Sequence, residues 1–96
     1  MIRHIVIYKF HNRTDEIVKK TKEVLYSMKG KVPQVIDMEC GEDFLGSPRS
    51  FDFFLSVTLK DRQALADYQV DKYHVDVVKK HMHSVMKESA SVDSEF

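Results

Sequence analysis

The sequence predicts one small α+β domain whose elements follow the order β-α-β-β-α-β. Three observations predict it: a length that suits one domain, alternating apolar residues in several segments, and helical spacing of apolar residues in others. A chain of 96 residues leaves no room for a second hydrophobic core. Its 43% hydrophobic and 31% charged residues are typical of a globular protein. We therefore expect residues 1–96 to form a single domain.

The first strand is expected over residues 2–10, where apolar and β-branched side chains dominate. Alternation places Ile5 and Ile7 on one face of this strand. The opposite face receives Ile2, His4, Val6, Tyr8 and Phe10. Because both sets are largely apolar, the strand is expected to be buried on both faces.

The next segment has the spacing of an amphipathic helix, and Asn12 or Thr14 can cap its start. The residues that recur at helical offsets are Ile17, Thr21, Val24, Leu25 and Met28. Gly30 can adopt the left-handed conformation that often follows a helix, and Pro33 prevents continuation. The first half of the chain therefore reads β then α.

Two further strands are expected over residues 35–40 and 51–59, separated by a loop that contains two glycines and a proline. The clearest alternation in the chain is that of Phe51, Phe53, Leu55, Val57 and Leu59. Asp61 can cap a second helical segment, which we expect to break near Val70 and to resume with Val78 and Met82 on one face. The tail alternates weakly from Ala90 to Phe96, which predicts a modest edge strand.

This order is that of a ferredoxin-like fold, in which both helices pack on one face of a four-stranded antiparallel sheet. Ile5, Ile7 and Phe54 then lie on the face that the helices leave open. A second copy of the chain is the economical cover, since two-fold homodimers are the commonest soluble assemblies. We therefore expect a homodimer in which two sheets form a barrel.

Charge and cysteine content argue against several classes of protein. Fifteen basic residues balance fifteen acidic ones, so no net charge draws the chain to nucleic acid or an anionic membrane. Residues 49–57 echo the aromatic strand of RNA-recognition domains, but they lack its glycines and include Asp52. The N-terminus is too charged for a signal peptide or a membrane span. The lone Cys40 cannot form an intrachain disulfide, which favours the cytoplasm.

Taken together, these residues resemble the stress-responsive A/B-barrel (Dabb) family of dimeric α/β barrels. The resemblance covers nearly the whole chain and rests on M-I-R-H-I-V-I-Y-K-F at residues 1–10, M-K-G-K-V-P-Q-V at 28–35, the third strand, and A-D-Y-Q-V-D-K-Y-H-V-D-V-V from Ala66. Members include plant polyketide cyclases, heat- or salt-induced proteins without established chemistry, and many bacterial proteins of unknown role. The resemblance implies the fold more strongly than any activity.

The resemblance also implies a set of site residues. In the cyclases, a tyrosine and a histidine six residues later act on a polyketide between helix and sheet, and Tyr68 and His74 match that pair. His4 matches a histidine early in the first strand. This chain departs from the family by carrying Asp71 and Lys72 where members often have His-Pro, and Phe53 where the cyclases have a further histidine.

Each candidate residue has a catalytic and a purely structural interpretation. His74 can act as a general base, yet six positions on a straight helix separate two side chains by roughly 240°. Tyr68 and His74 therefore converge only if the helix breaks, and otherwise they pack as ordinary core residues. His4 is either a satisfied core histidine or a member of the same site.

Other polar residues carry weaker signals. No metal site or cofactor is expected, since His81 and His83 diverge on a helix. Cys40 suits an inert apolar filler, and the pair Lys79 and Lys80 suits a solvated helix face.

Three functions follow as hypotheses. In the first, a homodimer binds a small apolar molecule between sheet and helices, in a cavity lined by His4, Val6, Tyr8, Leu25, Phe53, Leu55, Tyr68 and His74. In the second, a polyketide-cyclase-like enzyme uses His74 as base, with Tyr68 or His4 stabilising the oxyanion. In the third, the dimer is purely structural or stress-protective, with a filled interior.

Overall fold

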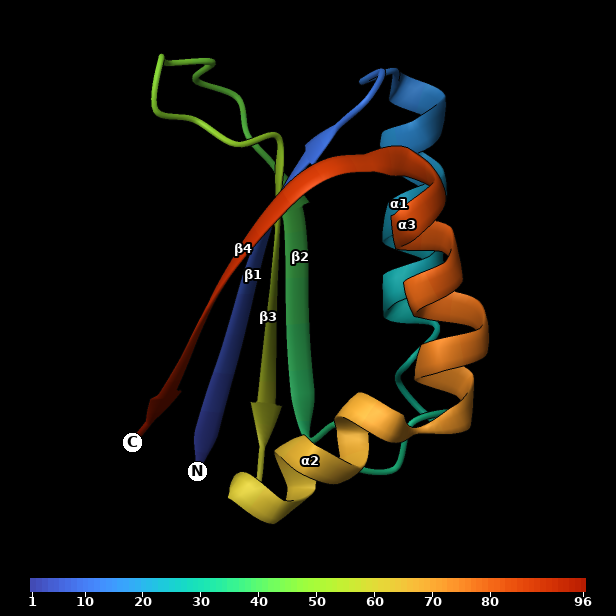
Figure 1. Ribbon diagram of the computed structural model, residues 1–96, viewed down its shortest axis with the longest axis vertical. Helices are drawn as coiled ribbons and strands as arrows, with labels where there is room; N and C mark the ends of the chain where they lie inside the picture. Colours follow the sequence, from blue (N-terminus) through green and yellow to red (C-terminus); the bar gives the residue numbers. More distant parts are fainter.

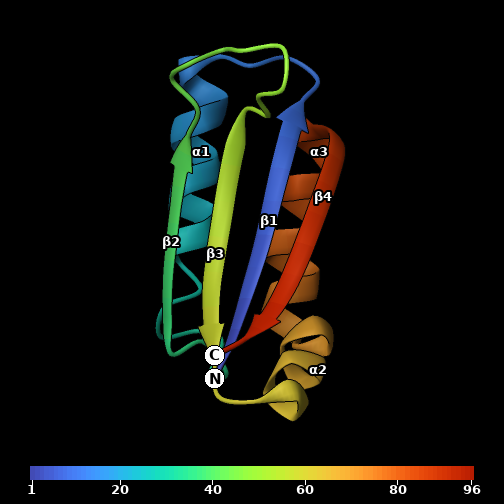
Figure 2. The same cartoon turned by 90° about the vertical axis from the view of Figure 1, so that its left-hand side faces the viewer.

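The computed structural model describes all residues from Met1 to Phe96. Its elements are β1 (Ile2–Phe10), α1 (Asp15–Tyr26), β2 (Asp37–Glu42), β3 (Phe53–Leu59), α2 (Arg62–Val70), the π-helix η1 (His74–Lys79), α3 (Lys80–Val85) and β4 (Met86–Glu95). The strands form one antiparallel sheet in the order β2-β3-β1-β4. Figures 1 and 2 show all helices on one face of this sheet. The predicted ferredoxin-like α+β fold is confirmed.

The core lies between the sheet and the helical layer. Along β1 and β3 the burial alternates as the period-two pattern predicts, so that Phe53, Leu55, Val57 and Leu59 are all buried. From the helical side, α1 contributes Val18, Thr21, Val24 and Leu25. Thr14 is the N-cap of α1, since its Oγ1 accepts a 3.1 Å hydrogen bond from Ile17 N. Gly30 has a φ of +85°, the left-handed conformation expected of it.

The boundaries of β2 and β3 differ from the sequence prediction. β2 begins at Asp37, because Val35 still belongs to the turn after Pro33 and its amide donates to the carbonyl of Val32. β3 begins at Phe53, two residues later than predicted, although Asp52 still donates its backbone amide to the carbonyl of Tyr8 on β1. The alternation of apolar residues does not reveal where these hydrogen bonds form, so it does not locate the ends of the strands.

The C-terminal strand is longer than predicted. β4 pairs with β1 from Ile2 opposite Glu95 to Phe10 opposite Met86, with one irregularity between Lys9 and Phe10. Nearly all of its side chains are exposed, so its sequence carries little apolar alternation. The strand is held by its backbone ladder with β1, which depends on main-chain groups that every residue has.

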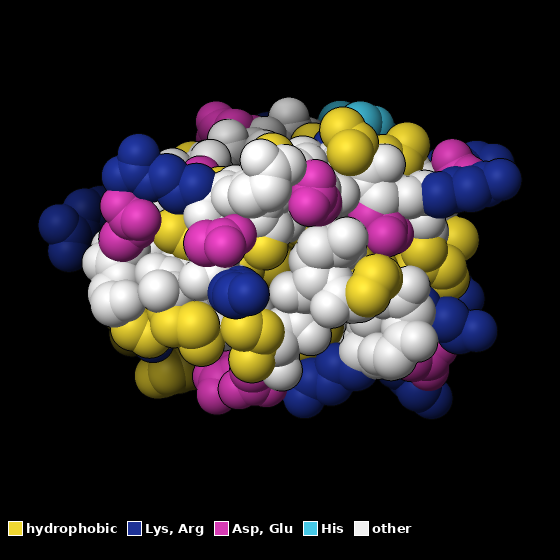
Figure 3. Space-filling view, turned by 90° about the horizontal axis from the view of Figure 1, so that it is seen from below, with side chains coloured by type: hydrophobic (Ala, Val, Ile, Leu, Met, Phe, Trp, Pro, Cys, Tyr) yellow, Lys and Arg dark blue, Asp and Glu magenta, His cyan; other side chains and the backbone are white.

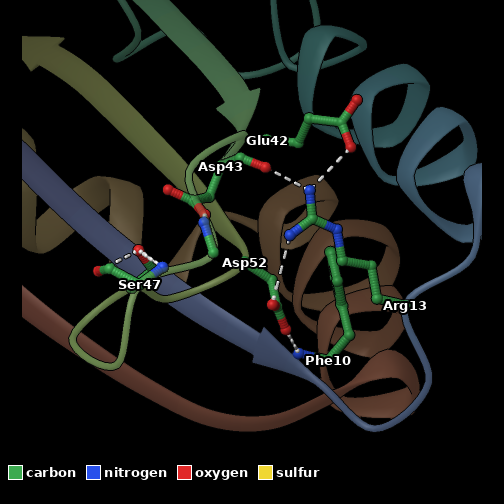
Figure 4. A network of polar contacts seen from close by, with 8 residues as sticks. Phe10, Arg13, Glu42, Asp43, Ser47 and Asp52 are labelled. Atoms are coloured by element: carbon green, nitrogen blue, oxygen red, sulfur yellow. Dashed lines mark hydrogen bonds and ion pairs between the residues drawn. The ribbon is translucent and has the colours of Figure 1, made fainter.

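The loop between β2 and β3 is anchored to the turn that follows β1. Figure 4 shows the Arg13 guanidinium between the carboxylates of Glu42, at 3.1 Å, and Asp52, at 3.5 Å, and it also donates to the Asp43 carbonyl. The second oxygen of Asp52 accepts a 2.8 Å hydrogen bond from Phe10 N, where β1 ends. This Arg13 network joins two loops at one end of the sheet.

The sheet face opposite the helices is open. Ile5 and Ile7 are half-buried there, whereas Phe54 is 38% and Val92 63% exposed. The register explains the grouping, because Ile7 pairs with Phe54 on β3 and Ile5 pairs with Val92 on β4. The four side chains form one apolar group on this face.

Charged side chains of both signs intermingle over the end of the molecule that carries α2 and the chain termini (Figure 3). This mixture agrees with the balance of fifteen basic and fifteen acidic residues in the chain. None of the helices combines the length and apolar character needed to span a lipid bilayer.

Candidate functional site

The helix break predicted near Val70 is present and is made by Asp71. This residue leaves the helical conformation with φ −56° and ψ 134°. Its carboxylate accepts a 3.0 Å hydrogen bond from His74 N, and its carbonyl accepts a 2.9 Å bond from Val75 N. Asp71 therefore caps the helical segment that follows, as aspartate commonly does at an N-terminus. The chain achieves the break without a proline.

The break brings Tyr68 and His74 together. Their rings stack with centroids 4.0 Å apart and planes inclined by 24°. The His74 Nδ1–H donates to the Tyr68 carbonyl at 2.9 Å, because a carbonyl oxygen can only accept. This bond fixes the ring and its tautomer, so Nε2 carries the free lone pair of the neutral imidazole. Nε2 makes no hydrogen bond within the protein, and His74 lines the pocket described below.

His4 approaches the same site from the sheet. Its ring meets that of Tyr68 edge to face, with centroids 5.7 Å apart. On its other side, Nδ1 lies 2.5 Å from an Asp93 carboxylate oxygen. Asp93 stands opposite His4 in the β1–β4 register. A carboxylate on Nδ1 orients an imidazole and leaves its Nε2 for other contacts.

Asp93 was missed by sequence reasoning. In the alternation predicted for the tail, Asp93 lies on the face opposite Val92 and Ser94. No feature of the sequence shows which residue of β1 Asp93 faces. Only the register of β4 against β1 pairs it with His4.

These residues border a pocket of about 310 Å³ between the sheet and the α2–η1–α3 segment. Its lining consists of His4, Val6, Tyr8, Leu55, Tyr68, Gln69, His74, Val78, Lys79, Met82, His83, Met86, Ser89 and Ser91. Six of the eight residues expected to line a cavity are therefore together: all but Leu25 and Phe53. The volume is near the lower limit of small-molecule sites.

Leu25 and Phe53 do not line this pocket. Leu25 is fully buried in α1, on the part of the helical layer that packs the core. The Phe53 ring lies 5.9 Å from that of Phe10, near the end of the sheet where the Arg13 network sits. The pocket is displaced toward β4 instead, because small side chains on that strand, Ser89 and Ser91, leave space beside β1.

The family model described as the stress responsive A/B barrel domain matches residues 2–96, nearly the whole chain. The chain belongs to this family. No curated protein matches it significantly.

Solved structures share the fold of this A/B-barrel domain at low sequence identity. A dimeric ferredoxin-like protein of unknown function from Thermobifida fusca is 18% identical, with a TM-score of 0.85 over 99% of this chain and 90% of that one. A Dabb family protein from Mesorhizobium loti is 20% identical, with a TM-score of 0.74 over 98% and 94% of the two chains. A hydroxynitrile lyase from Passiflora edulis is 11% identical, with a TM-score of 0.78 over 97% and 90%.

Burial sets the protonation of the aromatic residues in the A/B-barrel pocket. It lowers the pKa of His74 from its ordinary 6.5 to about 4, since desolvation disfavours the imidazolium. The pKa values of Tyr8 and Tyr68 are raised well above the usual range for the same reason, so both phenols stay neutral. The Tyr68 hydroxyl points to Met28 Sδ, at 3.8 Å. Tyr68 therefore offers the pocket its ring and its carbonyl contact to His74, while its hydroxyl is engaged in the core.

The prediction that Lys79 lies on a solvated helix face is wrong. Its side chain lines the pocket, and Nζ donates a 3.0 Å hydrogen bond to the Gln69 carbonyl. Lys80 is exposed, as expected. The difference arises in η1, because a π-helical turn shifts side chains relative to α-helical spacing.

No group of three or more histidine, cysteine, aspartate or glutamate side chains is arranged to hold a metal ion. Cys40 is half-buried on β2, and burial raises the pKa of its thiol above the ordinary value. The thiol is accordingly protonated at neutral pH, a state in which it is a poor nucleophile.

Proposed function

We propose that this A/B-barrel protein is a homodimer that binds a small, mostly apolar molecule bearing a hydroxyl group in the pocket between sheet and helices. The observation that carries the proposal is the free Nε2 of His74. It is the acceptor of a neutral imidazole whose other nitrogen is bound to the Tyr68 carbonyl. An acceptor held in a wall that is half apolar favours a molecule that can donate one hydrogen bond to it.

The rest of the pocket supports an apolar ligand. Seven of its fourteen lining residues are hydrophobic. Val6, Leu55 and Val78 come from the sheet and η1, and the flexible side chains of Met82 and Met86 complete this wall. Methionines adapt their shape to an apolar guest at little cost.

The homodimer is supported by the open apolar sheet face and by relatives. Proteins of this fold from Thermobifida fusca and Jannaschia are described as dimeric. Pairing through Ile7, Phe54 and Val92 would remove apolar side chains of that face from water. The single free cysteine further supports a cytoplasmic location for this dimer.

The binding proposal is tested with the ¹⁵N-labelled protein and two naphthalene probes. Titration with 2-naphthol should shift the backbone amide signals of Val6, Val78 and Met82, which line the pocket. 2-Methoxynaphthalene cannot donate a hydrogen bond and should bind more weakly, by about tenfold. Absence of amide shifts with either probe at millimolar concentration would favour the purely structural dimer.

The variant His74→Phe separates the hydrogen bond from general affinity for aromatic molecules. It keeps a ring to stack on Tyr68 and removes the acceptor, so the preference for 2-naphthol should vanish. His11→Phe is the matched control, because His11 is exposed and lies outside the pocket lining. A preference that survives in His74→Phe would contradict the assigned role of Nε2.

A second candidate function is an enzyme that removes a proton next to a carbonyl group. It is favoured by two imidazoles on one pocket, each oriented through Nδ1: His74 by the Tyr68 carbonyl and His4 by Asp93. In this reaction His74 Nε2 takes the proton, and His4, as the imidazolium paired with the Asp93 carboxylate, donates its Nε2–H to the enolate oxygen, with Asp93 as a positioning residue. The hydroxynitrile lyase from Passiflora edulis shows that the fold can carry enzymatic chemistry.

The enzyme candidate is tested by exchange of the α-protons of 2,4-pentanedione-type 1,3-dicarbonyl compounds with deuterated water. His74→Phe should remove any acceleration above buffer, and His11→Phe should keep it. Equal exchange rates with wild-type protein and with buffer would leave only the binding function.

A further inference from the structure

We propose that Lys79 and His83 form an anion-binding subsite on the water-facing side of the pocket, and that the molecule bound is a small amphipathic carboxylic acid. This inference rests on the proposed function, because it names the class of molecule that the same pocket takes. It places the apolar body against the buried wall and the carboxylate beside Lys79.

The π-helix η1 places Lys79 in the pocket. His74, Val78 and Lys79 all line it, although the first and last are five positions apart. On an α-helix that spacing would turn the two side chains roughly 140° apart. The wider π-helical turn brings them to one side, and such turns are frequent at functional sites. The positive charge of Lys79 also contributes to the lowered pKa of His74, which agrees with their proximity.

The Lys79 ammonium is held in place and still has donors to offer. One of its three N–H groups bonds to the Gln69 carbonyl, near the end of α2, at 3.0 Å. This tether limits the motion of a long, flexible side chain before any ligand arrives, which lowers the entropic cost of binding. Two N–H donors remain for a carboxylate.

The charges around the pocket favour an anion. No aspartate or glutamate is among its fourteen lining residues. Asp93 is engaged by His4, and Asp71 accepts from the amide of His74 at the cap. A cation that faces a cavity without a facing carboxylate attracts an anionic group.

The polar groups gather on the exposed side. His83, Ser89 and Ser91 are exposed, whereas His4, Tyr68 and His74 on the same pocket are buried. The serine hydroxyls and the His83 ring add hydrogen-bond donors to the same pocket as Lys79. An amphipathic acid fits this division, since its carboxylate stays near water while its apolar part enters the protein.

The test compares 4-phenylbutanoate with 4-phenylbutanamide, which has nearly the same shape and no charge. Both are titrated into the ¹⁵N-labelled full-length protein at pH 7, with the amide signals of Lys79, His83 and Ser91 as reporters. The carboxylate should bind about tenfold more tightly than the amide, the usual effect of a charge-assisted hydrogen bond. Lys79→Gln should remove this preference, and Lys79→Arg should keep it.

Lys80→Gln is the matched control, since it removes the same charge from the adjacent, exposed position. It should leave the preference for the carboxylate intact. If Lys79→Gln and Lys80→Gln lost the preference for the carboxylate equally, the subsite would be overturned, because the preference would then depend only on the net charge of the protein. Equal affinities of wild-type protein for both probes would also overturn it while leaving the binding function in place. If neither probe shifts the pocket amides while 2-naphthol still does, the subsite fails and the proposed function stands; if 2-naphthol also leaves them unshifted, both fail.

Discussion

At the scale of single residues, the properties of His74 follow from two neighbours. The Tyr68 carbonyl holds Nδ1, and burial against the Tyr68 ring keeps the imidazole neutral. A neutral histidine with a fixed tautomer is a defined hydrogen-bond acceptor, which a mobile surface histidine is not. The lowered pKa also makes His74 a weaker base than a free imidazole, which favours binding over proton abstraction.

The buried neutral state of His74 should make the stability of the protein depend on pH. Its pKa is about 4 in the folded chain and near 6.5 when unfolded. Below pH 6.5 the unfolded chain takes up a proton that the folded chain does not, so the free energy of unfolding falls as pH drops toward 4. Urea denaturation at pH 7 and pH 4.5 measures this loss.

The contribution of His74 is isolated by its substitution with phenylalanine. His74→Phe should lose less stability between pH 7 and pH 4.5 than the wild-type protein does. His81 also has a lowered pKa through burial, and it is unchanged in both proteins. An identical pH dependence in the variant would show that His74 is not held neutral.

Asp71 should stabilise the protein through its cap on the second helical segment. Asp71→Ala removes the acceptor of the His74 amide and should lower the free energy of unfolding by about 1 kcal/mol. Asp71→Asn keeps an acceptor oxygen and should retain most of that stability. The measurement is urea denaturation at pH 7, and equal losses in the two variants would contradict the capping role.

At the scale of elements, the Arg13 network determines how firmly the β2–β3 loop is held. Its carboxylate partners are partly exposed, so each ion pair adds little to global stability. Its effect is local: Arg13 joins the loop to the chain just after β1, and Asp52 ties the same loop to the end of that strand (Figure 4).

Arg13→Gln should therefore loosen the loop without unfolding the domain. We expect faster proteolytic cleavage between Phe44 and Ser50, with a change in the free energy of unfolding of about 1 kcal/mol or less. Arg49→Gln is the matched control, because Arg49 lies in the same loop, is exposed and forms no ion pair. Equal cleavage rates in the two variants would show that the Arg13 network does not hold the loop.

At the scale of the whole molecule, the helices cover only one face of the sheet. The other face presents Phe54 and Val92 to water beside Ile5 and Ile7, as the sequence predicted for three of these residues. A domain of 96 residues gains considerably from burying such a surface against a second copy.

A charge at Phe54 on this face should prevent dimer formation. Sedimentation at micromolar concentration should show a dimer for wild-type protein and a monomer for Phe54→Glu, because the carboxylate would have to be buried unpaired. Val75→Glu is the control: Val75 is 40% exposed, close to the 38% of Phe54, but belongs to η1 on the opposite side of the domain. A monomeric wild-type protein, or a dimeric Phe54→Glu, would contradict the proposed interface.

The sequence by itself determined the order of the elements, the cap at Asp61, the break in the second helical segment and the two apolar faces of the sheet, and it narrowed the cap of the first helix to Asn12 or Thr14. These features are local, because apolar period, capping side chains and backbone preferences act over a few neighbouring residues. The family followed from the same residues in their order and spacing.

Only the tertiary structure decided the composition of the pocket. The pairing of Asp93 with His4 depends on strand register, and the space beside β1 depends on serines in a strand held by its backbone. Lys79 enters the pocket because a π-helical turn replaces α-helical spacing, and Leu25 and Phe53 stay in the core because the cavity lies nearer to β4. The π-helical turn is local but departs from the α-helical period; the other features are relations between distant segments, about which periodicity along one segment carries no information.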